Sequence, residues 1–327
     1  MHILVLGAAG MVGRKFIERI AKDGHLGGKD IAKVTAHDIT AAVKPAGATF
    51  VFEAHTGDVA IPGAAEKLIA GRPDIILHLA AIVSGEAEAD FDKGYRINLD
   101  GTRFLFDAIR LTGDGYCPRV LFTSSIAVFG APFPHAIGDE FHLTPLTSYG
   151  TQKAIGELLL ADYTRRGFFD GVGIRLPTIC VRPGAPNKAA SGFFSNIIRE
   201  PMAGNEAVLP VEDDVMHWHA SPRVAIGFLI HAATMDTAAI GTRRNLSMPG
   251  LAATVGEQIA ALGKVAGNKA VKLIRREPDV AIQKIVAGWP RNFDVHRASA
   301  LGFKAESTFE EIIRVHLDDE LHSKLGV

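Results

Sequence analysis

The stretch HILVLGAAGMVG, residues 2–13, joins a short apolar run to three glycines and decides the fold. HILVLGA (2–8) has the length and composition of a buried strand, and 11–24 has apolar residues at helical spacing. Glycines between a strand and a helix allow a tight turn, close approach of a pyrophosphate and close packing of the helix. We therefore expect a dinucleotide site at Gly7, Gly10, Met11, Val12 and Gly13. The alternative is a tight turn without a ligand.

The alternation of strand and helix patterns continues through the first half of the chain. Strands are predicted at 33–38, 48–54, 74–81, 119–125 and 171–178, and helices near 62–71, 91–112 and 149–167. Strands that are separated by crossover helices pair in parallel. The sequence therefore predicts an α/β fold, a doubly wound parallel sheet (Rossmann fold).

The regular pattern ends near residue 180. RPGAPNKAASG (182–192) is rich in Pro, Gly, Ala and Ser and predicts a long loop, and helices and short strands follow in less regular order. We predict an NAD-binding domain over 1–180, to which part of 213–250 returns. Residues 181–327 mainly form a smaller C-terminal substrate-binding cap.

Composition favours a soluble cytoplasmic protein that acts on a small molecule. The 35 basic and 36 acidic residues leave a formal charge of -1, which gives no reason to expect nucleic acid or an anionic membrane as partner. The two cysteines, Cys117 and Cys180, have no metal or redox spacing, which favours a reducing compartment. The N-terminus lacks the features of a signal peptide, and we find no apolar run of about 18 residues.

Two acids follow predicted strands. Asp38 ends the second strand, where a carboxylate accepts the hydroxyls of an adenosine ribose and repels a 2′-phosphate. This favours NAD over NADP, although Asp38 capping a loop is the alternative. Asp58, after the third strand, is a weaker candidate as acceptor for the adenine amine.

SYGTQK (148–153) places Tyr149 one helical turn before Lys153, and Ser125 ends the fifth strand. A phenol titrates near ~10, and a neighbouring ammonium lowers that pKa toward neutral values. Ser125 and Tyr149 can then converge on one substrate oxygen at the carboxyl edge of the sheet, with Lys153 on the same helix face. The alternative to a catalytic role is that Tyr149 and Lys153 are an ordinary polar pair on an amphipathic helix.

Several motifs together resemble the short-chain dehydrogenase/reductase superfamily in its extended, sugar-epimerase-like branch. They are GAAGMVG, HLAA (78–81), INLDGT (97–102), TSSIAVFG, SYGTQK and ALGFKAESTFEEIIR (300–314), and the resemblance covers nearly the whole chain. It implies Ser125, Tyr149 and Lys153 as the catalytic set. It implies an NAD site that also includes Asp38, Asp58, Val59, Leu79, Ala80, Ala81, Asn98 and Pro177. It further implies a homodimer through helices 91–112 and 149–167.

Two departures from this branch bear on the substrate. Thr178 stands where the nucleotide-sugar enzymes usually carry Asn, and Met216 stands where they carry an Arg that holds a diphosphate. Loss of that charge-assisted contact disfavours nucleotide sugars. The cap instead resembles that of dehydrogenases that oxidise C2 of a four-carbon sugar acid with NAD. The rivals are a nucleotide-sugar epimerase or dehydratase and a non-enzymatic NAD-sensing protein.

Polar residues of the cap are the candidates for binding a sugar acid. Arg182 is suited to a carboxylate, and Ser84 in the first domain is suited to a hydroxyl. His217 and His219 are either structural or donors to the substrate carboxylate. Two histidines on one face of a strand would also permit a metal, but the sequence shows no third ligand for it. The remaining candidates are Asn187, Lys188 and Ser191.

Overall fold

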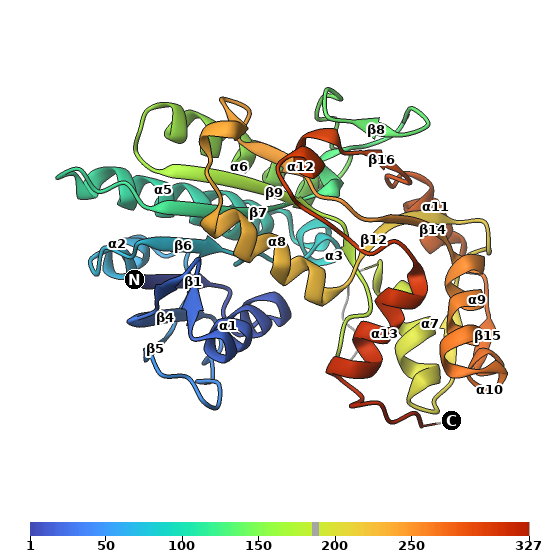
Figure 1. Cartoon of the computed structure of the whole chain (residues 1–327). Helices are drawn as coiled ribbons and strands as arrows, with labels where there is room; N and C mark the ends of the chain where they lie inside the picture. The colour runs from blue at the N-terminus through green and yellow to red at the C-terminus, as the bar shows by residue number, and fades with distance from the viewer. Residues whose placement is uncertain (185–189, 327) are drawn as a thin grey trace. The chain divides into compact units, whose positions relative to one another are not determined.

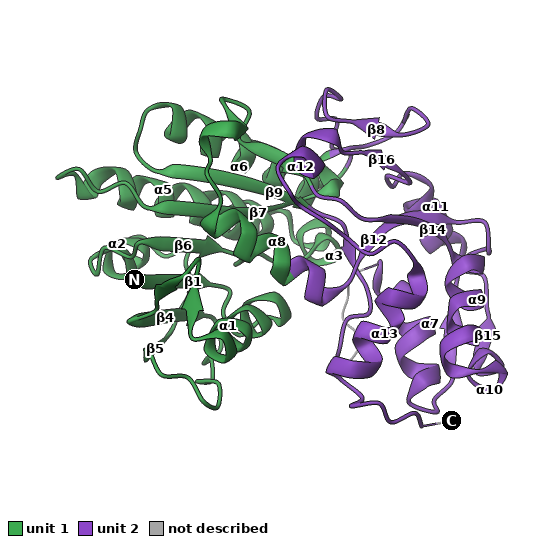
Figure 2. Cartoon of the chain, viewed as in Figure 1, with its two compact units in different colours: residues 1–128, 147–175, 226–247 green, residues 129–146, 176–225, 248–327 purple. Residues whose placement is uncertain are grey.

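The computed structural model describes residues 1–184 and 190–326, which form two compact units (Figures 1 and 2). Unit 1 comprises 1–128, 147–175 and 226–247, and unit 2 comprises 129–146, 176–225 and 248–327. This division differs from the predicted boundary at residue 180, because 129–146 belongs to unit 2. Asn187 and Lys188 lie outside the described residues.

Unit 1 contains a seven-stranded sheet in the order β13-β9-β7-β6-β1-β4-β5. Pairings along it are parallel, for example Ile3 with Val34 and with Ile75, which confirms the doubly wound fold. Its strands are β1 (His2–Leu6), β4 (Lys33–Asp38), β5 (Val51–Thr56), β6 (Ile75–His78), β7 (Arg119–Ser125), β9 (Asp170–Leu176) and β13 (Asn245–Ser247).

Two predicted strands have extra residues at one end: β5 begins later than predicted, and β6 ends earlier. In both, the neighbouring strand sets the limit. β5 begins at Val51 rather than at residue 48, because Val51 pairs with Lys33, the first residue of β4. β6 ends at His78 rather than at residue 81, because His78 pairs with Leu6, the last residue of β1. The residues after His78 are therefore free to turn toward a ligand.

Helices cover both faces of this sheet (Figure 1). α2 (Ala64–Ile69), α5 (Gly101–Thr112) and α6 (Ser148–Arg165) form one layer, and their apolar side chains share a core with Phe106, Phe122 and Phe169. α1 (Met11–Asp23) and the unit 1 part of α8 (Pro222–Thr234) lie on the other face. Short elements of the unit are β2 (His25–Leu26), β3 (Lys29–Asp30), α3 (Ser84–Ala89), the 3-10 turn Ile126–Val128 and the 3-10 turn Ala238–Ile240.

The predicted helix at 91–112 has three parts. α4 (Phe91–Gly94) leads into a π-helical turn, η1 (Tyr95–Asp100), which continues directly into α5. A π-turn inserts a residue into the helical repeat and is frequent at functional sites. Asn98 is the buried residue of this turn.

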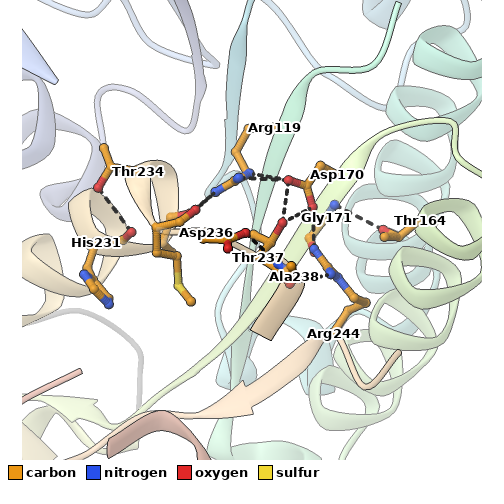
Figure 3. Close-up of polar contacts among 12 residues, drawn as sticks. Arg119, Thr164, Asp170, Gly171, His231, Thr234, Asp236, Thr237, Ala238 and Arg244 are labelled. Atoms are coloured by element: carbon orange, nitrogen blue, oxygen red, sulfur yellow. Dashed lines mark hydrogen bonds and ion pairs between the residues drawn. The ribbon is translucent and has the colours of Figure 1, made fainter. Parts of the chain in front are cut away.

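Residues 226–247 join unit 1 through a polar cluster around Asp170 (Figure 3). The Asp170 carboxylate forms ion pairs with Arg119 (2.8 Å) and Arg244, and Thr237 donates a hydrogen bond to it (2.8 Å). Arg119 also donates to the carbonyl oxygens of Ala232 (2.7 Å) and Met235 (3.2 Å), near the C-terminal end of α8. The cluster attaches α8 and the segment after it to the starts of β7 and β9.

Unit 2 has its own hydrophobic core. A three-stranded sheet, β10 (Thr178–Ile179), β12 (Met216–Ala220) and β14 (Leu251–Thr254), accompanies α7 (Gly192–Met202), α9 (Val255–Ala266) and α13 (Phe309–Asp319). Capping boxes begin α9 at Thr254 and α13 at Thr308. The remaining elements are β8 (Ile137–Gly138), β11 (Ala207–Leu209), α10 (Asn268–Val271), β15 (Ile274–Arg276), α11 (Val280–Ala287), β16 (Phe293–Asp294) and α12 (His296–Ala300).

Within residues 1–184 and 190–326, no helix combines the length and apolar character needed to cross a membrane.

Candidate functional site

The turn between β1 and α1 requires glycine. Gly7 has a φ of +83°, and a Cβ atom there would lie 2.7 Å from the backbone nitrogen of Ala80. A Cβ atom on Gly13 would collide with the carbonyl oxygen of Gly7. A side chain at Gly7 would push the turn away from the residues that follow β6, and one at Gly13 would push α1 away from the turn.

The N-terminus of α1 suits an anion. Gly10 precedes the helix and has no side chain with which to cap its first N–H groups. These donors and the helix dipole favour a negative group, and the predicted residues Met11 and Val12 form the first turn. The residues present therefore fit the pyrophosphate of a dinucleotide.

Asp38 connects the end of β4 to the glycine turn. One carboxylate oxygen accepts a hydrogen bond from the Ala9 N–H (2.9 Å), and the other accepts one from the Ile39 N–H (2.7 Å). The second oxygen also accepts a longer bond from the Thr40 N–H (3.4 Å), whereas the oxygen bound to Ala9 keeps a lone pair for a ribose hydroxyl. Asp38 thus caps the loop and fits the ribose role, which stays a prediction.

Asp58 has a partner that the sequence did not indicate. Its carboxylate accepts a hydrogen bond from the Ala60 N–H (2.8 Å) and forms an ion pair with Arg96 of η1 (2.5 Å). Partial burial alone would raise the pKa of Asp58, but the Arg96 guanidinium and the Ala60 N–H outweigh it and lower that pKa. Asp58 is therefore a stable anion, and its predicted adenine contact remains untested. Val59 beside it packs into the core of unit 1.

The segment after β6, which the sequence predicts as part of the cofactor site, lies beside the glycine turn. The Leu79 N–H donates to the Leu6 carbonyl (2.9 Å), which fixes the start of Leu79–Ala80–Ala81 beside the glycine turn. Asn98 binds the backbone of the next residue, Ile82: its Oδ1 accepts from the Ile82 N–H (2.9 Å), and its Nδ2 donates to the Ile82 carbonyl (3.2 Å). Pro177 lies in unit 2, between β9 and β10.

The three predicted catalytic residues lie on β7 and α6, both in unit 1. Ser125 is the last residue of β7, and its Oγ accepts a hydrogen bond from the Ala127 N–H (3.1 Å). Thr147 caps α6 by accepting from the Gly150 N–H (3.0 Å), so that Tyr149 stands in the first turn. A Cβ atom on Gly150 would collide with the Ala127 carbonyl oxygen. This close approach brings the first turn of α6 against the residues that follow Ser125.

Lys153 is buried one turn beyond Tyr149. Its side chain is 3% exposed, and its Nζ donates to the Thr123 carbonyl oxygen (2.7 Å). Nζ lies 4.9 Å from the ring centre of Phe122 and 5.7 Å from that of Tyr149. Burial lowers the pKa of Lys153 to about 8, and the Glu157 carboxylate opposes this shift. The ammonium is therefore charged at neutral pH, and its field favours the phenolate of Tyr149.

A buried polar network that sequence analysis missed continues along α6. Glu157 is 1% exposed; its carboxylate accepts from Ser124 (2.6 Å) and pairs with Arg175 through two hydrogen bonds (2.9 and 2.7 Å). Its position one turn after Lys153 is the only signal in the sequence. The network joins α6 to the ends of β7 and β9 and so fixes the helix that carries Tyr149 and Lys153.

Ser84 begins α3, which is attached to the start of α6. The Glu88 carboxylate of α3 accepts a hydrogen bond from the Ser148 N–H (2.9 Å). Ser84 therefore stands on an element tied to the turn that presents Tyr149. Its substrate contact stays a prediction.

Two of the substrate candidates in unit 2 contact each other. Nη2 of Arg182 donates to the Ser191 hydroxyl (2.7 Å), and its Nε donates to the Ile179 carbonyl (3.0 Å). Ser191 directly precedes α7. The structure thus brings together two residues that are nine positions apart and leaves their role in binding untested.

His217 and His219 of β12 are buried. Nδ1 of His217 donates to the Pro290 carbonyl (2.8 Å), so its Nε2 accepts from the Thr178 hydroxyl (2.7 Å). Burial lowers the pKa of His217 to about 4 and that of His219 well below its ordinary value, so both rings are neutral at pH 7. This arrangement favours the structural alternative for His217. Among the described residues, no three His, Cys, Asp or Glu side chains are grouped to hold a metal ion.

Comparison with known proteins agrees with this geometry. The model of the NAD dependent epimerase/dehydratase family matches residues 3–219. The chain is 43% identical over 324 residues to a D-erythronate dehydrogenase of Cupriavidus necator, with 98% of each chain covered. It is 36% identical over 321 residues to a D-erythronate dehydrogenase of Haemophilus influenzae, covering 98% of this chain and 100% of the relative.

A solved structure is similar over almost the whole length. It is described as the nucleoside-diphosphate-sugar epimerase from Agrobacterium tumefaciens, and it is 67% identical, with a TM-score of 0.97 over 99% of this chain and 95% of that chain. The glycine turn, the acid at the end of β4 and the Ser125, Tyr149 and Lys153 set lie inside the matched region. The chain belongs to the NAD-dependent epimerase/dehydratase family.

Proposed function

We propose that this protein is an NAD-dependent dehydrogenase that oxidises the C2 hydroxyl of a small sugar acid, with D-erythronate as the best candidate and the 2-oxo acid as product. The observation that carries the proposal is the buried Lys153 ammonium 5.7 Å from the ring of Tyr149, in a helix packed against the end of β7. Full-length similarity to two D-erythronate dehydrogenases supports the choice of substrate.

Each catalytic residue has a defined task in this proposal. Tyr149, as phenolate, accepts the proton of the C2 hydroxyl, and Ser125 Oγ–H donates a hydrogen bond to that oxygen. Lys153 stabilises the phenolate by its charge. Bound NAD would supply the hydride acceptor for C2. Residues of the glycine turn, Asp38 and Leu79–Ala81 would hold the cofactor.

We assign the substrate carboxylate to Arg182 and Ser191 of unit 2. A guanidinium presents several N–H donors in one plane, which matches a carboxylate. The guanidinium of Arg182 donates to the Ser191 hydroxyl (2.7 Å) and the Ile179 carbonyl (3.0 Å), which holds it beside Ser191 at the start of α7. A C2-hydroxy acid supplies the anion that this cation favours, whereas a neutral polyol does not.

A nucleotide-sugar epimerase is the second candidate, because the 67% identical structure is described as one. Epimerases of this kind oxidise and then reduce the same sugar, so they form no net NADH. Two residues argue against this alternative: Met216 lacks the charged donors of the Arg that holds a diphosphate, and Thr178, which stands in place of Asn, donates its hydroxyl hydrogen to His217.

One assay separates the candidates. Purified protein with NAD is followed for NADH formation with D- and L-erythronate, D- and L-threonate, longer aldonates and UDP-sugars. We expect turnover confined to four-carbon acids. Conversion of a UDP-sugar without net NADH, together with no reaction on any acid, would replace the dehydrogenase by the epimerase.

Tyr149→Phe is the matched variant for this assay. Because it removes only the proton acceptor, we expect kcat to fall by roughly 10²- to 10⁴-fold while NADH binding is retained. Full activity of the variant would refute the catalytic assignment.

We further propose a cytoplasmic homodimer. The layer formed by α5 and α6 exposes Leu111 (68%) and Leu158 (66%), which a second copy of the same layer would cover. The cysteines, Cys117 and Cys180, are unpaired, as expected in a reducing compartment. Light scattering that gives the mass of one chain would refute the dimer, and cell fractionation tests the location.

A further inference from the structure

Gln152 lies between the two catalytic residues of α6 and has no role in the proposed chemistry. Its side chain is fully buried, with 0% exposure. It follows Tyr149 by three positions, which places it on the Tyr149 side of α6. A long amide buried at such a position needs a defined partner.

The partner is Asn98 in the π-turn. Asn98 Nδ2 donates a hydrogen bond to Gln152 Oε1 (2.8 Å) and another to the Ile82 carbonyl (3.2 Å). Asn98 Oδ1 accepts from the Ile82 N–H (2.9 Å). Since the Ile82 N–H can only donate, Oδ1 must face it, and this fixes the orientation of the whole Asn98 amide. Gln152 must then present its oxygen to Asn98.

The other end of the amide, Gln152 Nε2, is buried against Gly94 and has no hydrogen-bond partner among the described residues, so the bond to Asn98 is the one that holds the group. A Cβ atom on Gly94, at the end of α4, would lie 2.7 Å from Gln152 Nε2. Gly94 is therefore the residue that leaves room for the amide group. The side chain is held between α4 and η1, and its acceptor oxygen points to Asn98.

The chain of contacts ends at the cofactor side of the site. Ile82 follows Ala80 and Ala81 directly, and Ala80 lies against Gly7 of the glycine turn. The contacts thus run from α6 through Gln152 and Asn98 to the backbone beside the glycine turn. Without the Gln152 oxygen, one Nδ2 hydrogen of Asn98 would be buried without an acceptor, an unfavourable state that favours rotation of the Asn98 amide away from Ile82.

We propose that Gln152 is a positioning residue for the cofactor: it fixes Asn98, and through Asn98 the 79–82 backbone, against the helix that carries Tyr149 and Lys153. The inference rests on the proposed assignment of the NAD site to the glycine turn and Leu79–Ala81. It adds a residue that touches neither substrate nor cofactor.

The test compares Gln152→Met, Gln152→Glu and Thr151→Ala. Methionine keeps the length of the side chain but removes the amide acceptor, whereas glutamate keeps an oxygen acceptor for Asn98 Nδ2. Thr151 is the neighbouring residue, and its hydroxyl donates to the Thr147 carbonyl at the start of the same helix (3.0 Å). It therefore controls for a general disturbance of α6.

NADH affinity is the first measurement, by fluorescence titration of each folded variant. We expect the Kd for NADH to rise about tenfold or more in Gln152→Met, since one buried hydrogen bond is lost. Gln152→Glu should lose less affinity than Gln152→Met, because it keeps the acceptor for Asn98 Nδ2; its remaining loss reflects burial of a carboxyl group at a position with 0% exposure. Thr151→Ala should be unchanged. Equal affinity in Gln152→Met and wild type, or an equal loss in Gln152→Met and Gln152→Glu, would overturn the proposal.

Hydrogen exchange of the peptide that contains Ile82, without NADH, is the second measurement. The Ile82 amide should exchange about tenfold faster in Gln152→Met and at the wild-type rate in Gln152→Glu. An unchanged rate in Gln152→Met would overturn the proposal. Neither measurement uses a sugar acid, so failure of the wild type to oxidise D-erythronate would refute the proposed substrate without affecting this result.

Discussion

Lys153 carries a charged side chain in an almost fully buried position, where lysine is rare. It is 3% exposed, and burial lowers its pKa to about 8, against an ordinary value of 10.5. Between these two pH values the unfolded chain holds the proton and the folded chain does not. The free energy of unfolding therefore gains a term that rises with pH from about 8 to 10.5.

Replacing Lys153 by Met should remove that term. From pH 7.5 to pH 10.5, we expect the free energy of unfolding of the wild type to rise more than that of Lys153→Met, by on the order of 1–3 kcal/mol. Urea unfolding of both proteins at the two pH values measures it, and other titrating groups cancel in the comparison. The same pH dependence in both proteins would contradict the expectation.

Sequence patterns gave the residue types of the site but not all of their partners. Glycines 7 and 13, Asp38, Ser125, Tyr149 and Lys153 stand at positions that a strand–turn–helix pattern singles out. The partners of Asp58 and Glu157 are Arg96 and Arg175, which are far away in the sequence and carry no local signal. Only the folded chain shows that these charges meet.

At the scale of elements, α6 is the helix that periodicity describes least well. Gln152, Lys153 and Glu157 are polar and yet buried, so its apolar residues do not form a single face. The π-turn in 95–100 is a similar case, because its apolar spacing is that of one continuous helix. In both places the departures from a simple helix coincide with the candidate site.

Two glycines in helices allow a matched test of packing. A Cβ atom on Gly156 of α6 would lie 2.6 Å from the ring of Phe122, whereas one on Gly227 of α8 would meet no atom within 4 Å. We expect Gly156→Ala to lower the free energy of unfolding by about 1–3 kcal/mol, because the core around Phe122 has no space. Gly227→Ala should raise it by up to about 1 kcal/mol, through helix propensity. Thermal or urea unfolding of both variants measures these changes, and stabilisation by Gly156→Ala would show that Phe122 can move aside.

At the scale of the whole molecule, unit 1 depends on a segment that returns late in the chain. Asp170 compensates the charges of Arg119 and Arg244, and Arg119 in turn binds carbonyl oxygens at the end of α8 (Figure 3). Sequence analysis predicted that part of 213–250 rejoins the first domain. It did not predict that 129–146 belongs to unit 2, because that segment has no distinct composition.

Asp170→Asn tests this attachment. The Asp170 side chain is 33% exposed, so solvent screens part of its interaction with Arg119. We expect the free energy of unfolding to fall by roughly 1–3 kcal/mol, because two largely buried guanidinium groups, on Arg119 and Arg244, lose their counter-charge. Asp162→Asn breaks an exposed pair with Arg165 and should change it by less than about 0.5 kcal/mol. Equal losses of unfolding free energy in Asp170→Asn and Asp162→Asn, measured by urea unfolding, would show that the Asp170 cluster stabilises the fold no more than an exposed ion pair.

The return of residues 226–247 to the sheet also has a consequence for biosynthesis. Six segments of the chain alternate between the two units, and β13, at 245–247, pairs with the edge of the sheet at β9. A nascent chain on the ribosome cannot finish its nucleotide-binding layer until this strand has left the exit tunnel, although the glycine turn was made first. A gene fragment that stops at residue 180 would for the same reason encode an open sheet edge, with Arg119 and Asp170 deprived of the partners that residues 226–247 supply.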